Sequence, residues 1–211
     1  CRISQVLTAD SLTGIGFEAQ NAFFDAAGKP TGTEFYDSLS NFVYFTSSYS
    51  YNVDTVFVNN GQYFLNDAAT GRVKEFKGLV DSSDPLSDTV RISFTYNTAG
   101  YLVKKEYYFF NMPEPFLRST YTYNNGNLTR ALLENLFPST EAVIDATVEY
   151  NLSQPVNGFM YIFPEGFYTA PYNLSFNFGK RPANTFKKVT TRIYNGGTVT
   201  DSLVTTYKNY K

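Results

Sequence analysis

Apolar and polar residues alternate with a period of two along several segments of the chain. Residues 90–96 place Val, Ile, Phe and Tyr at every second position, with Arg, Ser and Thr between them. Residues 144–150 repeat this arrangement with Ile, Ala, Val and Tyr against Asp, Thr and Glu. A period of two with one polar face is typical of antiparallel strands that keep one side in water. The pattern therefore predicts an all-β fold.

The dipeptide Tyr-Asn recurs along the chain, several times directly before a glycine-containing turn. It occurs at Tyr51-Asn52, Tyr96-Asn97, Tyr123-Asn124, Tyr150-Asn151, Tyr172-Asn173 and Tyr194-Asn195. From Tyr96 onward the spacing between copies suits one hairpin per copy. Asn tolerates the left-handed backbone region and Gly occupies it freely, so such turns reverse the chain easily. The repeat predicts an antiparallel meander of hairpins.

Four other segments are apolar on both faces and therefore cannot leave one side in water. They are residues 42–45, 56–58, 107–110 and 159–163. Strands of this kind require either a second covering layer or a sheet curved enough to enclose its inner face. Together with the hairpin repeat, they predict a strongly curved sheet or a partly open barrel.

The chain has no low-complexity linker that would divide it. We expect a single all-β domain over residues 16–211, preceded by an N-terminal tether over residues 1–15. Only residues 130–137 have a helix-like pattern, because Leu132, Leu133 and Leu136 are close to helical spacing. We therefore expect one short helix there.

The composition removes several classes of function. Aromatic residues make up 18% of the chain, enough to fill a core, and charged residues only 17%, with a net charge of −2. Nucleic-acid binding requires a basic surface, so we expect no nucleic acid partner. With no His and one Cys, the chain excludes Ser-His-Asp and Cys-His hydrolases and any cysteine-held metal cluster. We expect no enzyme activity, no catalytic or metal-binding residue and no cofactor.

The one cysteine, Cys1, is the first residue of the sequence. In a bacterial lipoprotein the signal peptide is cut before a cysteine that carries the lipid, so Cys1 is the predicted lipidation site. The alternative is a free cysteine at an arbitrary chain boundary. The lipoprotein interpretation places the protein in the cell envelope, lipid-anchored to the outer membrane and either periplasmic or surface-exposed. The membrane is then a partner through the N-terminal anchor.

A membrane-spanning barrel is the structural alternative to this anchored domain. Such a barrel requires lipid-facing strands of about 9–11 residues and aromatic girdles. The aromatic content fits, but the polar faces of the strands around Arg91 and Glu149 do not. The sequence favours a soluble domain held at the membrane by its N-terminus.

Several turn-and-strand segments resemble a known family. They are Tyr63–Asn66 with Gly71–Val73, Phe94–Asn97 with Gly100–Leu102, Tyr121–Leu128, and Tyr150-Asn151 with Pro155 and Asn157. The first two resemble YD-like repeats, and in the last the proline precedes the asparagine, unlike the family pattern. The family is a group of Bacteroidetes lipoproteins of unknown function described as having a porin-like fold. The resemblance covers about residues 40–211 and implies a curved meander on a lipidated, secreted protein without an established active site.

Two aromatic segments form the candidate ligand face. Its residues are Tyr107, Phe109, Phe159, Tyr161, Phe163 and Tyr168. Aromatic side chains of this kind line an apolar pocket or offer a platform on which sugars stack. The alternative is ordinary packing in the core and on the sheet face.

Each charged cluster is either a binding site or a set of solvated surface residues. Asp81, Asp84 and Asp88 could supply oxygen ligands to Ca²⁺, but they lack the Gly and terminal Glu of an EF-hand loop, which favours a solvated turn. We expect the pairs Lys104-Lys105 and Lys187-Lys188 to lie on solvated strand faces.

Three functions remain open. The leading hypothesis is a non-enzymatic cell-envelope lipoprotein whose curved sheet presents a binding or interaction surface. The main alternative is a carrier that holds a lipid or another apolar ligand inside the curve. A third is a surface lipoprotein that binds glycans through exposed tyrosines. The partner is accordingly an unknown protein, lipid or glycan.

Overall fold

The computed structural model describes residues 2–9, 16–37, 43–58, 62–79, 89–109, 112–155 and 177–206. Within these ranges the chain forms fourteen strands and no helix. The strands are β1 (Arg2–Ala9), β2 (Gly16–Phe24), β3 (Pro30–Asp37), β4 (Val43–Asn52), β5 (Thr55–Val58), β6 (Gln62–Asn66), β7 (Val73–Leu79), β8 (Thr89–Tyr96), β9 (Leu102–Phe109), β10 (Leu117–Asn124), β11 (Asn127–Asn135), β12 (Glu141–Pro155), β13 (Asn184–Asn195) and β14 (Thr198–Thr206). A search of the same residues finds no helix suited to crossing a membrane.

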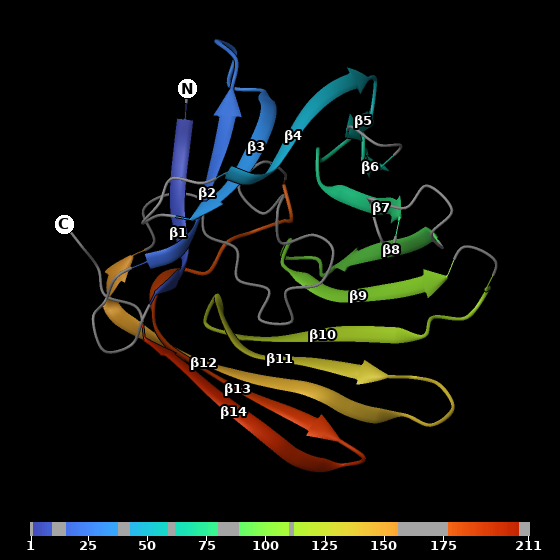
Figure 1. Cartoon of the computed structure of the whole chain (residues 1–211), viewed down its shortest axis with the longest axis vertical. Coiled ribbons are helices and arrows are strands. Elements are labelled where there is room, and N and C mark those ends of the chain that lie inside the picture. The colour runs from blue at the N-terminus through green and yellow to red at the C-terminus, as the bar shows by residue number, and fades with distance from the viewer. Residues whose placement is uncertain are drawn as a thin grey trace.

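The strands form one sheet in which each strand pairs with its neighbours in sequence. The order runs from β1 to β14 without a crossover, and the pairs are antiparallel. Figure 1 shows the strands arranged around a concave inner side, with β1 and β14 as the two edges of the open sheet. The predicted fold class, an all-β antiparallel meander forming a strongly curved sheet, is confirmed.

Residues 2–9 form a strand of the sheet. They lie within the segment 1–15 that the sequence pattern predicted to be a tether. They form β1, which pairs with β2 from Arg2 opposite Phe23 to Ala9 opposite Gly16. An extended segment beside a sheet edge gains a ladder of main-chain hydrogen bonds that depends little on its side chains. For this reason the side-chain pattern of a short N-terminal segment does not reveal the strand.

The helix predicted over residues 130–137 is wrong. Residues 127–135 form β11, which pairs with β10 on one side and with β12 on the other. Ala131 and Leu133 are 3% and 1% exposed, so burial here follows the period of a strand. Three closely spaced leucines fit either period over so short a run, and pairing along both sides of the segment decides for the strand.

The buried side chains of the inner face form a core that extends from β5 to β13. Its centre is a ladder of five residues on consecutive strands, each paired with the next: Val56, Phe64, Phe76, Ile92 and Tyr107. All five are at most 2% exposed. Burial of each such side chain contributes roughly 1.5–3 kcal/mol, so this ladder ties the middle strands together through their shared inner face.

Residues 177–183, here called the strap, cross the ends of three hairpins before the chain enters β13. In Figure 1 the strap is the orange-red trace that runs along the hairpin ends. Three main-chain hydrogen bonds attach it: Val73 N–H to Asn177 O (2.9 Å), Lys180 N–H to Gly100 O (2.8 Å) and Ala183 N–H to Gly126 O (3.0 Å). The strap thereby contacts the β6–β7, β8–β9 and β10–β11 turns in order.

The spacing of these contacts follows from two backbone dimensions. Successive strap contacts are three residues apart, and three extended residues span about 10 Å. Successive hairpins are two strands apart, and two strand spacings also amount to about 10 Å. The strap therefore meets each hairpin within two residues of the start of its second strand, which holds the three turns in one line.

One strap side chain enters the core. Phe178 is 1% exposed, and its ring centroid lies 6.3 Å from that of Phe64 and 5.5 Å from that of Phe94. The strap is therefore attached to the sheet both by main-chain hydrogen bonds and by a buried ring.

Gly179 is the strap position at which a side chain has no room. Its φ is +92°, and a Cβ there would lie 2.6 Å from the Gly100 carbonyl oxygen and 2.8 Å from the Tyr96 ring. We expect Gly179→Ala to lower the free energy of unfolding by about 2–5 kcal/mol, because backbone strain and overpacking act together. Urea denaturation measures this loss.

Gly28 provides the matched control. Its φ of +79° is also in the left-handed region, but a Cβ there would meet nothing within 4 Å. We expect Gly28→Ala to lower the free energy of unfolding by about 1–2 kcal/mol, from backbone strain alone. Equal losses in the two variants would contradict the close packing of the strap.

Candidate functional site

Two tyrosines of the Tyr-Asn repeat, Tyr51 and Tyr96, link consecutive hairpins at the turn end of the sheet. The Tyr51 hydroxyl donates a hydrogen bond to the Pro30 carbonyl, and the Tyr96 hydroxyl donates to the Val73 carbonyl at 2.7 Å. Burial raises the pKa of Tyr51 to about 12, and the Asp25 carboxylate adds to this rise. In both cases the acceptor lies about one hairpin earlier in the chain, so these tyrosines have a structural role.

Asn127, in the Asn-Gly-Asn-Leu element, joins the β10–β11 turn to the first residue of β13. Its Nδ2 donates to Asn184 Oδ1 at 2.9 Å, and the Asn184 N–H donates to Asn127 Oδ1 at 3.0 Å. Asn184 Nδ2 also donates to the carbonyls of Leu152 and Gln154, at 3.2 and 3.4 Å. Asn127 is 5% exposed, so its amide is satisfied inside the protein and fixes the point where the strap ends.

The structure places two of the six residues of the predicted ligand face. Tyr107 is fully buried in the core, opposite Ile92 and Leu117. Phe109 is 36% exposed and stacks on Phe116, with ring centroids 4.1 Å apart. Tyr107 therefore lies in the core, and Phe109 packs at its end. The remaining residues lie outside the described part of the chain: Phe159, Tyr161, Phe163 and Tyr168.

Other predicted sites also fall where the structure gives no description. They are the lipidation site Cys1 and the acidic residues Asp81, Asp84 and Asp88. Among the residues that are described, no three His, Cys, Asp or Glu side chains gather to hold a metal ion.

The pair Lys104-Lys105 is divided between the two faces of β9, and the prediction that both lysines are solvated is wrong for Lys105. Lys104 lies on the outer face, with Nζ 2.8 Å from Glu106 Oε2. Lys105 is fully buried. The period of two already contains this signal, because it puts Lys105 in phase with the buried Tyr107, two residues further along the strand.

Lys105 brings a positive charge into the inner face of the sheet. It lies opposite Phe94 on β8 and Ser119 on β10, and its Nζ is 5.7 Å from the centre of the Tyr121 ring. A buried ammonium is stable only when charged or polar groups compensate for its lost hydration. Lys105 and the buried Ser119 opposite it therefore form a polar part of the core that the sequence patterns did not identify.

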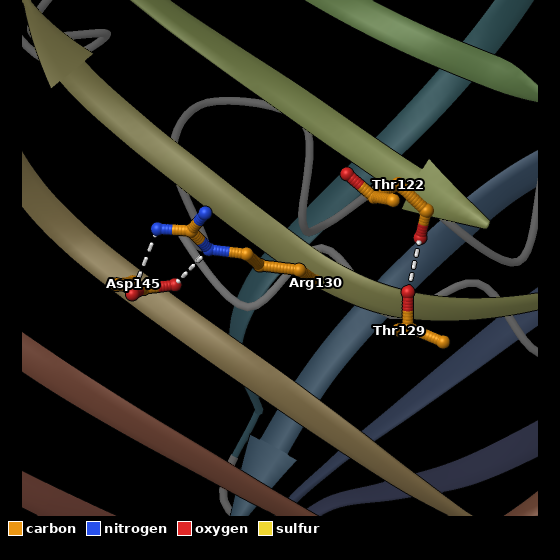
Figure 2. Close-up of polar contacts among 4 residues, drawn as sticks. All are labelled: Thr122, Thr129, Arg130 and Asp145. Carbon is orange, nitrogen blue, oxygen red and sulfur yellow. Dashed lines mark hydrogen bonds and ion pairs between the residues drawn. The ribbon is translucent and has the colours of Figure 1, made fainter. Parts of the chain in front are cut away.

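Hydrogen-bonded ion pairs cross the outer face of the sheet. Arg130 donates from Nε and Nη2 to the two carboxylate oxygens of Asp145, at 2.8 and 3.0 Å (Figure 2). Figure 2 also shows the Thr129 hydroxyl bonded to the Thr122 carbonyl on the neighbouring strand. The hydrogen bond and the charge of Asp145 raise the pKa of Arg130.

Glu106 lies between two cations on the same outer face. Lys104 Nζ is 2.8 Å and Arg118 Nε is 3.4 Å from its carboxylate. Partial burial raises the pKa of Glu106, but Lys104 and Arg118 outweigh this effect and lower it overall. Because both cations are about a third exposed to water, each pair contributes only about 0.2–1 kcal/mol. The charged groups lie on the outer face, as the alternation of polar residues predicts.

Apolar side chains become exposed toward the β14 edge. Along one line of paired residues on the inner face, Ala146 is buried, Thr191 is partly buried and Leu203 is 60% exposed. The next residue, Val204, points to the opposite face and is 46% exposed. Within the described ranges β14 pairs only with β13. The sheet therefore ends in a strand with an exposed apolar side chain on each face.

The fold is similar to two solved structures of porin-like proteins from Bacteroides. One, from Bacteroides uniformis ATCC 8492, matches over 96% of this chain and 92% of its own, with a TM-score of 0.54 and 14% identity. The other, from Bacteroides vulgatus ATCC 8482, matches over 90% and 86%, with a TM-score of 0.52 and 11% identity. No protein-family model and no curated protein matches the chain. The likeness supports the porin-like fold that the sequence resemblance implies.

The reciprocal amide pair of Asn127 and Asn184 can be tested by a double-mutant cycle. We expect Asn127→Ala and Asn184→Ala each to lower the free energy of unfolding by about 1–3 kcal/mol, because each leaves a polar partner unpaired. The double variant should lose less than the sum of the two, by about 0.5–3 kcal/mol. Urea unfolding followed by circular dichroism measures all three values.

Asn124→Ala serves as the control, since Asn124 is an exposed residue of the same turn. We expect it to change the free energy of unfolding by no more than about 0.5 kcal/mol. Additive losses for Asn127 and Asn184 would show that the two amides are not coupled.

Proposed function

We propose that this protein is a non-enzymatic lipoprotein of the cell envelope that binds a partner protein through edge strand β14. The observation that carries the proposal is the exposure of Leu203 and Val204 on opposite faces of that strand. Natural sheets protect their edges with charged residues, prolines or bulges. The nine residues of β14 include one charged residue, Asp201, and no proline. The register shift in the pairing of β14 with β13 lies at Thr200, near the β13–β14 turn, and the pairing is regular from Asp201 to Thr206.

The edge offers two kinds of contact to an extended segment of a partner. The main chain of β14 supplies donors and acceptors for a further strand, and this pairing depends little on the partner's sequence. The alternating side chains supply selectivity, with Leu203 on the inner face and Val204 on the outer face. Ile193 on β13, 37% exposed, enlarges the apolar surface beside the edge.

The proposed envelope location has two supports. Cys1 is the one cysteine of the chain, and acyl chains on it would contribute about 0.8 kcal/mol of membrane binding per buried CH₂. The fold is that of proteins named porin-like. The lack of His removes the most common general base, which favours a binding role over a catalytic one.

A photo-reactive phenylalanine analogue at position 203 tests the proposed interface. We expect ultraviolet irradiation of intact cells to give a discrete cross-linked adduct, because an edge-bound partner would lie against this side chain. The free energy of unfolding should change by no more than about 0.5 kcal/mol, since Leu203 is largely exposed. Mass spectrometry of the adduct identifies the partner, whether a second copy of this chain or another protein.

The matched control carries the same analogue at position 122. Thr122 is exposed on the hydrated outer face of β10 and far along the sheet from the edge. If the interface proposal holds, the adduct formed from position 203 does not form from position 122. Identical adducts at both positions, or none at position 203, would refute it.

The lipid anchor is tested separately by intact-mass spectrometry of the protein extracted from its own cell envelope. We expect a covalent mass increment of a diacylglycerol, with or without a further acyl chain, that maps to Cys1. Cys1→Ser should abolish the increment and release the protein from the membrane fraction, because the anchor requires the thiol. An unmodified Cys1 in the native protein would overturn the lipoprotein assignment and leave the proposed interface untouched.

A further inference from the structure

A row of tyrosines and basic residues follows the strap along the turn end of the sheet. This turn-end row consists of Arg72, Tyr96, Tyr101, Tyr123 and Lys180. Lys180 is exposed, and the other four side chains are partly buried. The row lies on the β6–β7 and β8–β9 turns, the ends of β8 and β10, and the strap. It is away from the proposed interface on β14 and is a second surface of the molecule.

Contacts between cations and aromatic rings hold the row together. Arg72 Cζ lies 5.5 Å from the centre of the Tyr96 ring, and Lys180 Nζ lies 5.7 Å from the centre of the Tyr101 ring. The rings of Tyr101 and Tyr123 have centroids 4.8 Å apart, with an angle of 35° between their planes. Such contacts keep long basic side chains close to the rings and limit their freedom before any ligand binds.

The row is continuous across the three hairpin ends. A Cβ on Gly100 would lie 2.7 Å from Arg72 Nη2, so the guanidinium of one turn covers the next turn. A Cβ on Gly126 would lie 3.0 Å from the Tyr101 hydroxyl oxygen, so Tyr101 covers the turn after that. The side chains therefore form one surface across the β6–β7, β8–β9 and β10–β11 turns.

This surface is positively charged although the chain is acidic overall. The three turns and the strap contain the basic residues Arg72, Lys180 and Arg181 against one carboxylate, that of Asp67. The Asp67 carboxylate accepts hydrogen bonds from the Thr70 N–H and hydroxyl within its own turn, both at 2.8 Å. The whole chain has a net charge of −2, so positive charge is concentrated at the turn end, where it attracts anions.

From this arrangement we propose that the turn-end row binds an acidic glycan chain. Arg72 and Lys180 would bind its carboxylate or phosphate groups, which guanidinium and ammonium groups recognise. The partly exposed tyrosine rings offer apolar faces to the sugar rings. The exposed amides of Asn124 and Asn125 offer donors and acceptors to sugar hydroxyls.

The low density of charge favours a glycan over a nucleic acid. Duplex DNA presents one negative charge for about every 1.7 Å of its length. The turn-end row has two cations, Arg72 and Lys180, distributed over hairpin ends that are about 10 Å apart. A glycan with one acidic group on each sugar ring comes closer to this density, and the faces of its rings can pack on the tyrosines.

Affinity electrophoresis of the full chain tests the proposal, with polygalacturonate or neutral dextran cast into the gel. We expect polygalacturonate to retard the protein and dextran to leave its mobility unchanged. Retardation should weaken as salt is added, since exposed charges are screened. The double variant Arg72→Glu/Lys180→Glu should bind polygalacturonate about tenfold more weakly, and Tyr101→Leu should weaken binding without changing its dependence on salt.

The control variant is Lys187→Glu, which makes the same charge change as Lys180→Glu at an exposed position of β13 outside the row. Thermal unfolding of each variant confirms that it is folded. Equal weakening by Lys187→Glu and Lys180→Glu would show attraction to net charge alone and overturn the proposal. No retardation by polygalacturonate, equal retardation by dextran, or equally strong competition by an oligothymidylate of matched charge would also overturn it.

Discussion

The hydrogen bonds between the strap and three hairpin turns hold the turn end of this protein together. They form because the spacing of residues along the strap matches the spacing of the hairpins. A step of three residues along the strap covers the same distance as the two strands of one hairpin, so one extended segment serves three consecutive turns. The buried ring of Phe178 and the lack of space beside Gly179 set the segment in position. The Tyr96 ring beside Gly179, the amide pair of Asn127 with Asn184 and the start of β13 all adjoin that segment. Without it, the hairpins would still share the inner-face core and the β7–β8 and β9–β10 ladders, but their turns would not be tied to one another.

The sheet separates its surfaces by chemistry. The inner face from β5 to β13 is packed with aromatic and aliphatic side chains, and the outer face carries ion pairs such as Arg130 with Asp145. The turn end adds a third surface, where tyrosines and cations alternate. The β14 edge is a fourth, because the core does not extend over it and Leu203 remains exposed. The turn end exposes cations beside aromatic rings, and the β14 edge exposes apolar side chains. The two proposed binding roles rest on these two surfaces.

Local patterns predicted the fold, and non-local contacts limited the prediction of the sites. The strands and turns are readable because side-chain alternation and Asn-Gly chemistry act over a few residues, as in Asn124-Asn125-Gly126. The sequence failed at residues 130–137, where three leucines fit two periods and only pairing with β10 and β12 decides. Lys105 was missed because a lysine suggested solvent although its phase indicated the core. The strap has no periodic pattern at all, and its role arises from contacts with residues far away in sequence.

The relation between strap and hairpins also restricts how this chain can change its length. One more hairpin between β6 and β11 would require three more residues in the strap. Inserting one or two residues into the strap would move each later strap N–H away from the turn carbonyl to which it donates. The chain can therefore gain or lose length in this region only by whole hairpins, each matched by three strap residues that lie between 57 (126 to 183) and 104 (73 to 177) positions further along the sequence.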